Sequence, residues 1–293
     1  MAESKTSDPA VAGSLFVVAT PIGNLGDMTM RAIATLKEAE LIIAEDTRRT
    51  GRLLKHFDIE TAVCAMFEHN EAAMIPQLVR RLEKGATMAL VSDAGTPTLS
   101  DPGYRLIKAA VAERIPVIPI PGVSAGVTAL SVSGLPTDQF VFIGFTERKQ
   151  SRLKNELKHL TTESRTLIFF ESPKRVVKLL QTMLRIWGDR SAMLAREMTK
   201  LHESYYRGLL SEIIRQLEEI PQVKGECTLV VAGAPHEESY LTEAELEQLL
   251  YARISQTKEP LSLMVRELAA ELGASKNLLY SKALAIQSRL AKK

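Results

Sequence analysis

The stretch that decides the fold is Leu15-Phe16-Val17-Val18-Ala19-Thr20-Pro21-Ile22-Gly23-Asn24-Leu25-Gly26-Asp27. It begins with an apolar run of the length of one strand and continues directly into small and polar residues that favour a turn. The sequence therefore predicts a strand near the start of the chain that ends in a tight loop.

The same pattern, a short apolar run followed by a loop of small or polar residues, recurs along the first half of the chain. The further runs are Leu41–Ala44, Met88–Ser92 and Val117–Ile120, and segments with helical spacing, such as 75–82, separate them. Strands that alternate with helices indicate a largely parallel sheet covered on both faces. Ligands of such sheets bind outside the carboxyl ends of the strands, so the loops after these runs are the expected site.

A second α/β domain is predicted beyond the turn-forming stretch Ser133–Asp138. We expect its strands to run in mixed directions. The expected strands are Phe140–Phe145, Thr166–Phe170, Met193–Arg196, Tyr205–Arg207 and Thr228–Ala232, and the expected helices are Leu153–Leu160, Val176–Trp187 and Leu210–Leu217.

The end of the chain has no strand pattern. Thr242 and Glu245 form a capping box that opens a helix, and Leu261–Leu272 and Lys276–Leu290 are predicted helices around the turn Gly273-Ala274-Ser275. This pattern is typical of a helix-turn-helix, with a plain helical hairpin as the alternative. We expect a disordered tail over residues 1–13, α/β domains over 14–135 and 138–235, and a helical domain over 240–293.

The composition is that of a globular protein without a strong overall charge. The formal net charge of the 293 residues is only +2, so contacts with nucleic acid must come from local patches. Cys64 and Cys227 lie far apart in the sequence and are expected to be reduced thiols. The sequence suggests neither a signal peptide nor a membrane span, so we expect a cytoplasmic protein that no membrane binds.

Other chemistries find less support in the motifs. Neither the G-x-x-x-x-G-K-[ST] phosphate loop nor the G-x-G-x-x-G dinucleotide motif occurs, and the histidines are scattered, so we expect no metal site. The segment Gly122–Gly126 matches the G-x-S-x-G pattern of a hydrolase nucleophile, which makes a hydrolase the alternative outside the transferases. The loops at the strand ends share small residues, whose main-chain groups can approach a zwitterionic, partly apolar cofactor closely.

An ordered set of motifs resembles the tetrapyrrole methylase superfamily, and in particular its bacterial members that methylate the ribose 2′-oxygen of a cytidine in small-subunit (16S) ribosomal RNA. The opening stretch, with Thr20-Pro21-Ile22-Gly23-Asn24-Leu25, is the first of them. After Gly144-Phe145 this chain departs from the family, since Thr146-Glu147-Arg148 stands where Leu-Pro is frequent. The other matching motifs are Ala44-Glu45-Asp46-Thr47-Arg48, Ser92-Asp93-Ala94-Gly95-Thr96-Pro97, Asp101-Pro102-Gly103, Gly134-Leu135-Pro136, Phe170-Glu171-Ser172-Pro173-Lys174-Arg175 and Ala195-Arg196-Glu197-Met198-Thr199-Lys200.

The resemblance implies an α/β fold of two domains, with a mostly parallel first sheet, a mixed second sheet and a small helical C-terminal domain. It implies S-adenosylmethionine as cofactor, bound in the cleft between the domains, and a homodimer. The residues that it assigns to the cofactor are Ile22, Asp93, Ala94, Gly95, Thr96, Leu99, Ser124, Ala125, Phe170, Ala195 and Thr228.

Methyl transfer from this cofactor requires placement of the 2′-oxygen and removal of its proton. The candidates for catalysis are Glu45, Asp46, Glu171 and Lys174, and the sequence does not choose among them. The candidates for contact with RNA phosphates are Arg48, Arg49, Arg52 and Arg175.

The small ribosomal subunit with its 16S RNA is the expected partner, and DNA is not. The alternatives are a methyltransferase of the same fold that acts on a tetrapyrrole or another small molecule, and a nucleic-acid-binding protein without activity. The basic residues Lys276, Lys282, Arg289, Lys292 and Lys293 suggest that the C-terminal domain docks RNA. Stabilisation of the dimer is its alternative role.

Overall fold

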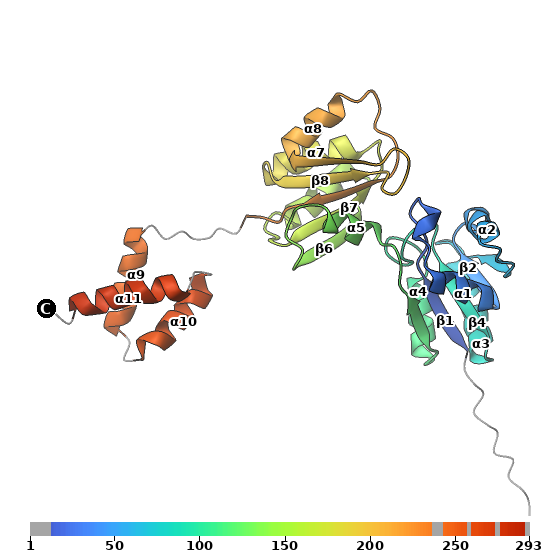
Figure 1. Cartoon of the computed structure of the whole chain (residues 1–293), viewed down its shortest axis with the longest axis horizontal. Helices are drawn as coiled ribbons and strands as arrows, with labels where there is room; N and C mark the ends of the chain where they lie inside the picture. The colour runs from blue at the N-terminus through green and yellow to red at the C-terminus, as the bar shows by residue number, and fades with distance from the viewer. Residues whose placement is uncertain (1–12, 236–242, 257–258, 273–275, 291–293) are drawn as a thin grey trace, which may run out of the picture. The chain divides into compact units, whose positions relative to one another are not determined.

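The computed structural model describes residues 13–235, 243–256, 259–272 and 276–290. The chain divides into two compact units between Ala234 and Pro235. The first unit contains two five-stranded sheets, and the described part of the second unit is helical (Figure 1). The predicted class, with a parallel first sheet, a mixed second sheet and a helical C-terminal part, is confirmed.

The first sheet is parallel throughout, with the strand order β3-β2-β4-β1-β5. The pattern of apolar runs did not predict the three-residue strand β3. The strands are β1 (Ser14–Val18), β2 (Leu41–Ala44), β3 (Val63–Ala65), β4 (Thr87–Val91) and β5 (Val117–Ile120), and the helices are η1 (Leu25–Asp27), α1 (Met30–Glu38), α2 (Thr47–His56), α3 (Glu71–Glu83), α4 (Tyr104–Ala112) and α5 (Ala125–Ser131).

Helices cover both faces of this sheet. Successive residues of a strand point to opposite faces, so Ile42 packs with Leu36 of α1 and Leu54 of α2, whereas Ile43 packs with Leu82 of α3. Because both faces are filled with apolar side chains, the ends of the strands are where this sheet can present polar groups to a ligand.

The second sheet has the strand order β6-β7-β10-β8-β9, in which only β6 and β7 are parallel. Helices α6 to α8 pack on one face, and α5, which lies within the predicted first domain of 14–135, packs on the other through Ala129 and Leu130. The elements are β6 (Phe140–Phe145), α6 (Gln150–His159), β7 (Thr166–Glu171), α7 (Val176–Trp187), β8 (Ser191–Arg196), β9 (Ser204–Leu209), α8 (Leu210–Glu218) and β10 (Cys227–Val231).

The second unit has a core of its own. Helices α9 (Glu243–Gln256), α10 (Leu261–Leu272) and α11 (Lys276–Leu290) enclose Leu250, Val265 and Leu279. None of the helices in the described ranges is long and apolar enough to cross a membrane. The predicted tail up to residue 12, Thr242 of the capping box, the turn 273–275, Lys292 and Lys293 lie outside the described residues.

Candidate functional site

A cavity of about 390 Å³ lies in the first unit, lined by loops of both sheets. The first sheet contributes the loops after β1, β2, β4 and β5, which a parallel sheet brings to one edge. The second sheet contributes the carboxyl ends of β6 and β7, the segment after β8 and the amino end of β10. We call the residues from the first group of loops the first wall, and those from the second sheet the second wall.

The loops after β1 and β4 are joined through the main chain. The N–H of Thr20 donates to the carbonyl of Gly95, and the N–H of Gly95 donates to the carbonyl of Thr20, both at 2.9 Å. The hydroxyl of Thr20 also donates to the carbonyl of Ser92 at 3.2 Å. Gly95 has a φ of +79°, a conformation that glycine adopts readily, and the side chain of Ile22 packs directly against its open side. Small residues therefore allow these loops to form one surface.

Two residues of the loop after β4 have a left-handed backbone although neither is glycine. Thr98 has a φ of +73° and Ser100 a φ of +71°. Such backbone strain persists only where the surroundings hold it, and it concentrates at functional sites. The Ser100 hydroxyl fills the space beside Gly144 of β6, so close that a Cβ at Gly144 would collide with it. The strained loop is thus held against the second sheet.

The first wall is acidic, with the carboxylates of Glu45, Asp93 and Asp101 along the cavity. Asp93 accepts a hydrogen bond from the N–H of Asp46 at 3.1 Å and forms an ion pair with Arg49 at 3.2 Å. Burial, together with the charge of Asp93, raises the pKa of Asp101 to about 6. Burial also raises the pKa of Glu45, helped by the charges of Asp93 and Asp101. Both groups are therefore stronger bases than ordinary carboxylates.

The second wall has a carboxylate, Glu171, whose oxygens are both occupied. Glu171 is only 2% exposed, and its Oε2 accepts the hydroxyl of Thr146 at 2.7 Å and pairs with Arg175 at 3.0 Å. Its Oε1 accepts the N–H of Ser172 at 2.7 Å. Arg175 also donates to the carbonyl of Thr146 at 3.1 Å and to that of Glu147 at 3.0 Å. Glu171 and Arg175 therefore fasten the loop after β6 to the loop after β7.

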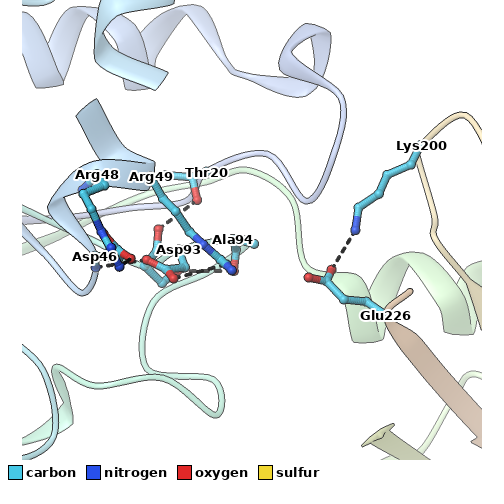
Figure 2. A network of polar contacts seen from close by, with 9 residues as sticks. Thr20, Asp46, Arg48, Arg49, Asp93, Ala94, Lys200 and Glu226 are labelled. Carbon is cyan, nitrogen blue, oxygen red and sulfur yellow. Dashed lines mark hydrogen bonds and ion pairs between the residues drawn. The ribbon is translucent and has the colours of Figure 1, made fainter. Parts of the chain in front are cut away.

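A second cavity, of about 470 Å³, shares Arg49, Asp93, Ala94 and Glu226 with the first. Lys200, in the segment between β8 and β9, also lines it and pairs with Glu226 at 3.1 Å. Figure 2 shows these pairs from close by, with Arg49, Asp93 and Ala94 to one side and Lys200 and Glu226 to the other. Charged groups of both walls thus line a continuous surface.

All residues predicted to bind the cofactor line the first cavity, with the exception of Ala195. Ala195 is buried in β8 opposite Thr228 of β10, which does line the cavity. No cluster of three or more possible metal ligands occurs among the residues that the structure describes.

The predicted catalytic residues separate. Glu45 and Glu171 line the cavity, whereas Asp46 and Lys174 do not. Asp46 caps α2 and binds Arg48, and this hydrogen bond holds the pKa of the Asp46 carboxyl far below its usual range. Lys174 is exposed on the loop after β7.

The four predicted phosphate contacts also differ in position. The side chain of Arg48 is 86% exposed and paired with Asp46. Arg49 lines both cavities and Arg52 lines the second, whereas Arg175 forms the half-buried brace to Glu171.

The structure adds cavity residues that were not predicted from the sequence. Asp101 belongs to a quoted motif, but nothing in its position indicated that its loop folds back to the cavity. Glu226 and Cys227 stand at the amino end of β10. The rule that ligands bind at the carboxyl ends of strands therefore does not predict them. The full set of additional lining residues is Ser100, Asp101, Phe145, Ser172, Pro173, Met198, Glu226 and Cys227.

Comparison with known proteins gives consistent matches. Residues 14–214 match the model of the tetrapyrrole (corrin/porphyrin) methylases. The chain is 53% identical over 229 residues to ribosomal RNA small subunit methyltransferase I of Streptococcus pyogenes serotype M6, covering 78% of this chain and 79% of that protein. It is 44% identical over 285 residues to the protein of the same name from Pseudomonas aeruginosa, covering 95% of this chain and 99% of that protein.

Among solved structures, uroporphyrin-III C-methyltransferase from Thermus thermophilus, complexed with S-adenosylhomocysteine, matches with a TM-score of 0.52 and 17% identity. The match covers 74% of this chain and 97% of that one. At this identity the likeness concerns the fold alone.

Proposed function

We propose that this chain, which belongs to the tetrapyrrole methylase family, transfers a methyl group from S-adenosylmethionine to the ribose 2′-hydroxyl of a cytidine in small-subunit (16S) ribosomal RNA. The observation that carries the proposal is the 44% identity over 95% of the chain to a ribosomal RNA small subunit methyltransferase I. The family match confirms the resemblance seen in the motifs. A tetrapyrrole substrate is not favoured, because the relatives that match nearly the whole chain carry the ribosomal RNA name.

The cavity suits this cofactor. Its volume of about 390 Å³ falls in the usual range for small-molecule sites. When bound, S-adenosylmethionine supplies a methyl group that its sulfonium charge already activates. We assign its cationic parts to the first wall, where Glu45 and Asp101 supply negative charge, and its adenine to the apolar surface of Phe170 and Met198.

We assign the removal of the ribose proton to Asp101. Of the predicted candidates, Glu171 has no free oxygen, Asp46 is committed to Arg48, and Lys174 lies off the cavity. A general base works best when its pKa lies near the working pH and it is still ionised. Asp101, with a pKa of about 6, meets both conditions, and Glu45 is the competing group on the same wall.

RNA phosphates are assigned to the arginines at the second cavity, Arg49 and Arg52, with Arg48 beside them. Arg175 acts through the loops that it braces. We further expect a cytoplasmic homodimer that does not bind DNA.

The test uses the natural substrate. Small-subunit RNA from a strain that lacks the gene should lose one ribose 2′-O-methylation, as seen by mass spectrometry of RNA fragments. Purified protein with S-adenosylmethionine should restore it on assembled small subunits from that strain, since one nucleotide must be selected from a folded surface. An unchanged methylation profile in the strain would overturn the proposal.

The C-terminal unit is proposed to dock the ribosomal subunit. Lys276 is exposed at the start of α11, while Arg289 approaches Glu247 at 3.9 Å. Deletion after Ala234 should raise the KM for the small subunit several-fold and leave cofactor affinity unchanged, because the cavity lies entirely in the first unit. If the unit instead holds a dimer together, light scattering of the truncated protein should give monomers with an unchanged RNA affinity.

A further inference from the structure

The end of strand β6 carries a phenylalanine that is exposed at the cavity. Phe145 is 60% exposed and lines the first cavity. Single exposed apolar residues are common on protein surfaces and need no special reason. Phe145 differs because its direction, its backbone and its neighbours are each fixed by a separate feature.

A β-bulge turns Phe145 toward the cavity. Phe142 pairs with Ile168, but the next pairs are Gly144 with Phe169 and Phe145 with Phe170. One residue of β6, Ile143, therefore has no partner in β7. Without this extra residue Phe145 would lie one step further along the pleat and face the core beneath α6 and α7. With it, Phe145 shares a face with Phe170, which also lines the cavity.

The backbone on both sides of Phe145 is held in place. Gly144 has a φ of +75° and lies directly against Ser100 of the strained loop. Thr146 is 4% exposed and is bound to Glu171 and Arg175. The rings of Phe145 and Phe170 meet edge to face, with centroids 5.7 Å apart. One face of a firmly mounted aromatic ring is therefore available to a ligand.

Three cationic residues lie on the loops that follow β6 and β7. Arg148 and Lys149 belong to the loop after β6. Lys174 belongs to the loop after β7, which Arg175 joins to the loop after β6 by a hydrogen bond to the carbonyl of Glu147. All three side chains are exposed, and none has a carboxylate partner within the described ranges. Proteins hold an unstacked nucleotide with its base on an exposed aromatic ring and its phosphates on cations of adjoining loops, and the loops after β6 and β7 supply such cations here.

We propose that Phe145 is the stacking platform for the base of the target nucleotide, with Arg148, Lys149 and Lys174 contacting the flanking phosphates. The inference rests on the proposed function and names the part of the substrate that this corner of the cavity recognises. A nucleotide drawn out of its stack exposes both faces of its base, and an aromatic side chain compensates for the lost neighbour. Stacking fixes the base and leaves its ribose to be presented to the acidic first wall.

The test compares variants of Phe145 on unmethylated small ribosomal subunits. Phe145→Ala and Phe145→Leu should each lower kcat/KM for the subunit about tenfold or more, because neither side chain can stack. Phe145→Tyr should restore nearly all of it. The matched control is Phe140→Ala, at the other end of the same strand, where a phenylalanine with 41% exposure lines neither cavity and its loss should leave kcat/KM unchanged.

A second measurement separates the base from the cofactor, whose adenine could also stack on this ring. Calorimetry should give the same dissociation constant for S-adenosylhomocysteine in the wild type and in Phe145→Ala. Equal losses of cofactor and subunit affinity would place the ring in the cofactor site and overturn the inference. Wild-type kinetics in Phe145→Ala would also overturn it. Inactivity of the wild type itself would overturn the proposed function, and this inference with it.

Discussion

The two walls of the first cavity differ in how far their charges are balanced. On the first wall Asp93 is paired with Arg49, but Glu45 and Asp101 have no ion pair within the described residues. Burial and the charge of the nearby Asp93 raise the pKa values of both. On the second wall the carboxylates are matched by cations, Glu171 by Arg175 and Glu226 by Lys200.

This difference separates two tasks. Partly buried carboxylates without a cationic partner are unfavourable in the free protein, and a cationic ligand or a proton relieves them. The first wall is therefore suited to binding a sulfonium compound and to accepting a proton from the substrate. The second wall is electrostatically complete and presents the rings of Phe145 and Phe170, so its contribution is shape and position.

The largest effect is expected from filling the cavity. Ala94 belongs to the first wall and lines both cavities. Ala94→Phe should abolish binding of S-adenosylmethionine, because the added ring occupies the ligand's volume. Calorimetry measures the loss. Ala112→Phe, at the exposed end of α4, is the control and should bind normally. Unchanged binding in Ala94→Phe would mean that the cofactor occupies neither cavity.

Asp101→Asn tests the imbalance of the first wall. It should lower kcat about 100-fold, the lower end of the range for general-base catalysis, since the methyl group is already activated. The wild-type kcat/KM, which reports groups of the free enzyme, should rise with pH through about 6, and the variant should lose this step. Glu45→Gln is the comparison. If Glu45→Gln abolishes the step and Asp101→Asn keeps it, the proton acceptor is Glu45.

The same variant should also be more stable than the wild type at neutral pH. The folded protein raises the pKa of Asp101 from an ordinary 3.8 to about 6, so it binds the proton more tightly than the unfolded chain does. Wild-type stability from this group is therefore present below pH 4 and is lost as the pH rises to 6. Thermal unfolding should show a gain for Asp101→Asn of about 1 kcal/mol at pH 7.5, reduced by solvent screening, and no gain at pH 4.

How far the sequence could predict this site depends on strand direction. A parallel sheet brings every carboxyl end to one edge, so Ile22, Asp93 and Ser124 could be placed together from the pattern of runs and loops. In the second sheet β10 runs against β7 and β8, which puts Glu226 and Cys227 at the cavity from the opposite end of their strand. Strand direction in a mixed sheet is set by tertiary contacts that no local pattern encodes.

Two further features depended on single residues. The direction of Phe145 follows from one extra residue in β6, and periodicity does not reveal a bulge of that size. Thr98 and Ser100 adopt a backbone that their residue types disfavour, so their loop, and Asp101 after it, could not be positioned from propensity. The family resemblance reaches further, since it also assigns Phe170 and Thr228 of the second sheet to the cofactor, and both line the cavity.

Glu171→Ala tests the balance of the second wall. It removes a carboxylate that is almost fully buried and leaves the Thr146 hydroxyl and the Ser172 N–H without their acceptor. We expect a loss of about 2 kcal/mol in the free energy of unfolding. Denaturant titration measures it. Glu163→Ala removes a carboxylate from an arginine pair whose arginine side chain is 46% exposed, and it should change stability much less. Equal losses would contradict a special role for burial at Glu171.

The smallest effect is expected from Arg52→Ala, which asks whether the cations beside the first wall serve RNA or the cofactor. Arg52 is exposed on α2, lines the second cavity and has no carboxylate partner in the described ranges. If it contacts one phosphate, its loss should weaken binding to the small subunit a few-fold and reduce the slope of affinity against salt concentration by about 1. Arg80→Ala, exposed on α3 and away from both cavities, should change neither quantity. Cofactor affinity should stay at the wild-type value, because the carboxylates of the first wall, and not this arginine, face the cationic ligand. A variant that loses cofactor affinity and keeps its salt slope would assign Arg52 to the cofactor, and the separation of tasks between the two walls would then be wrong.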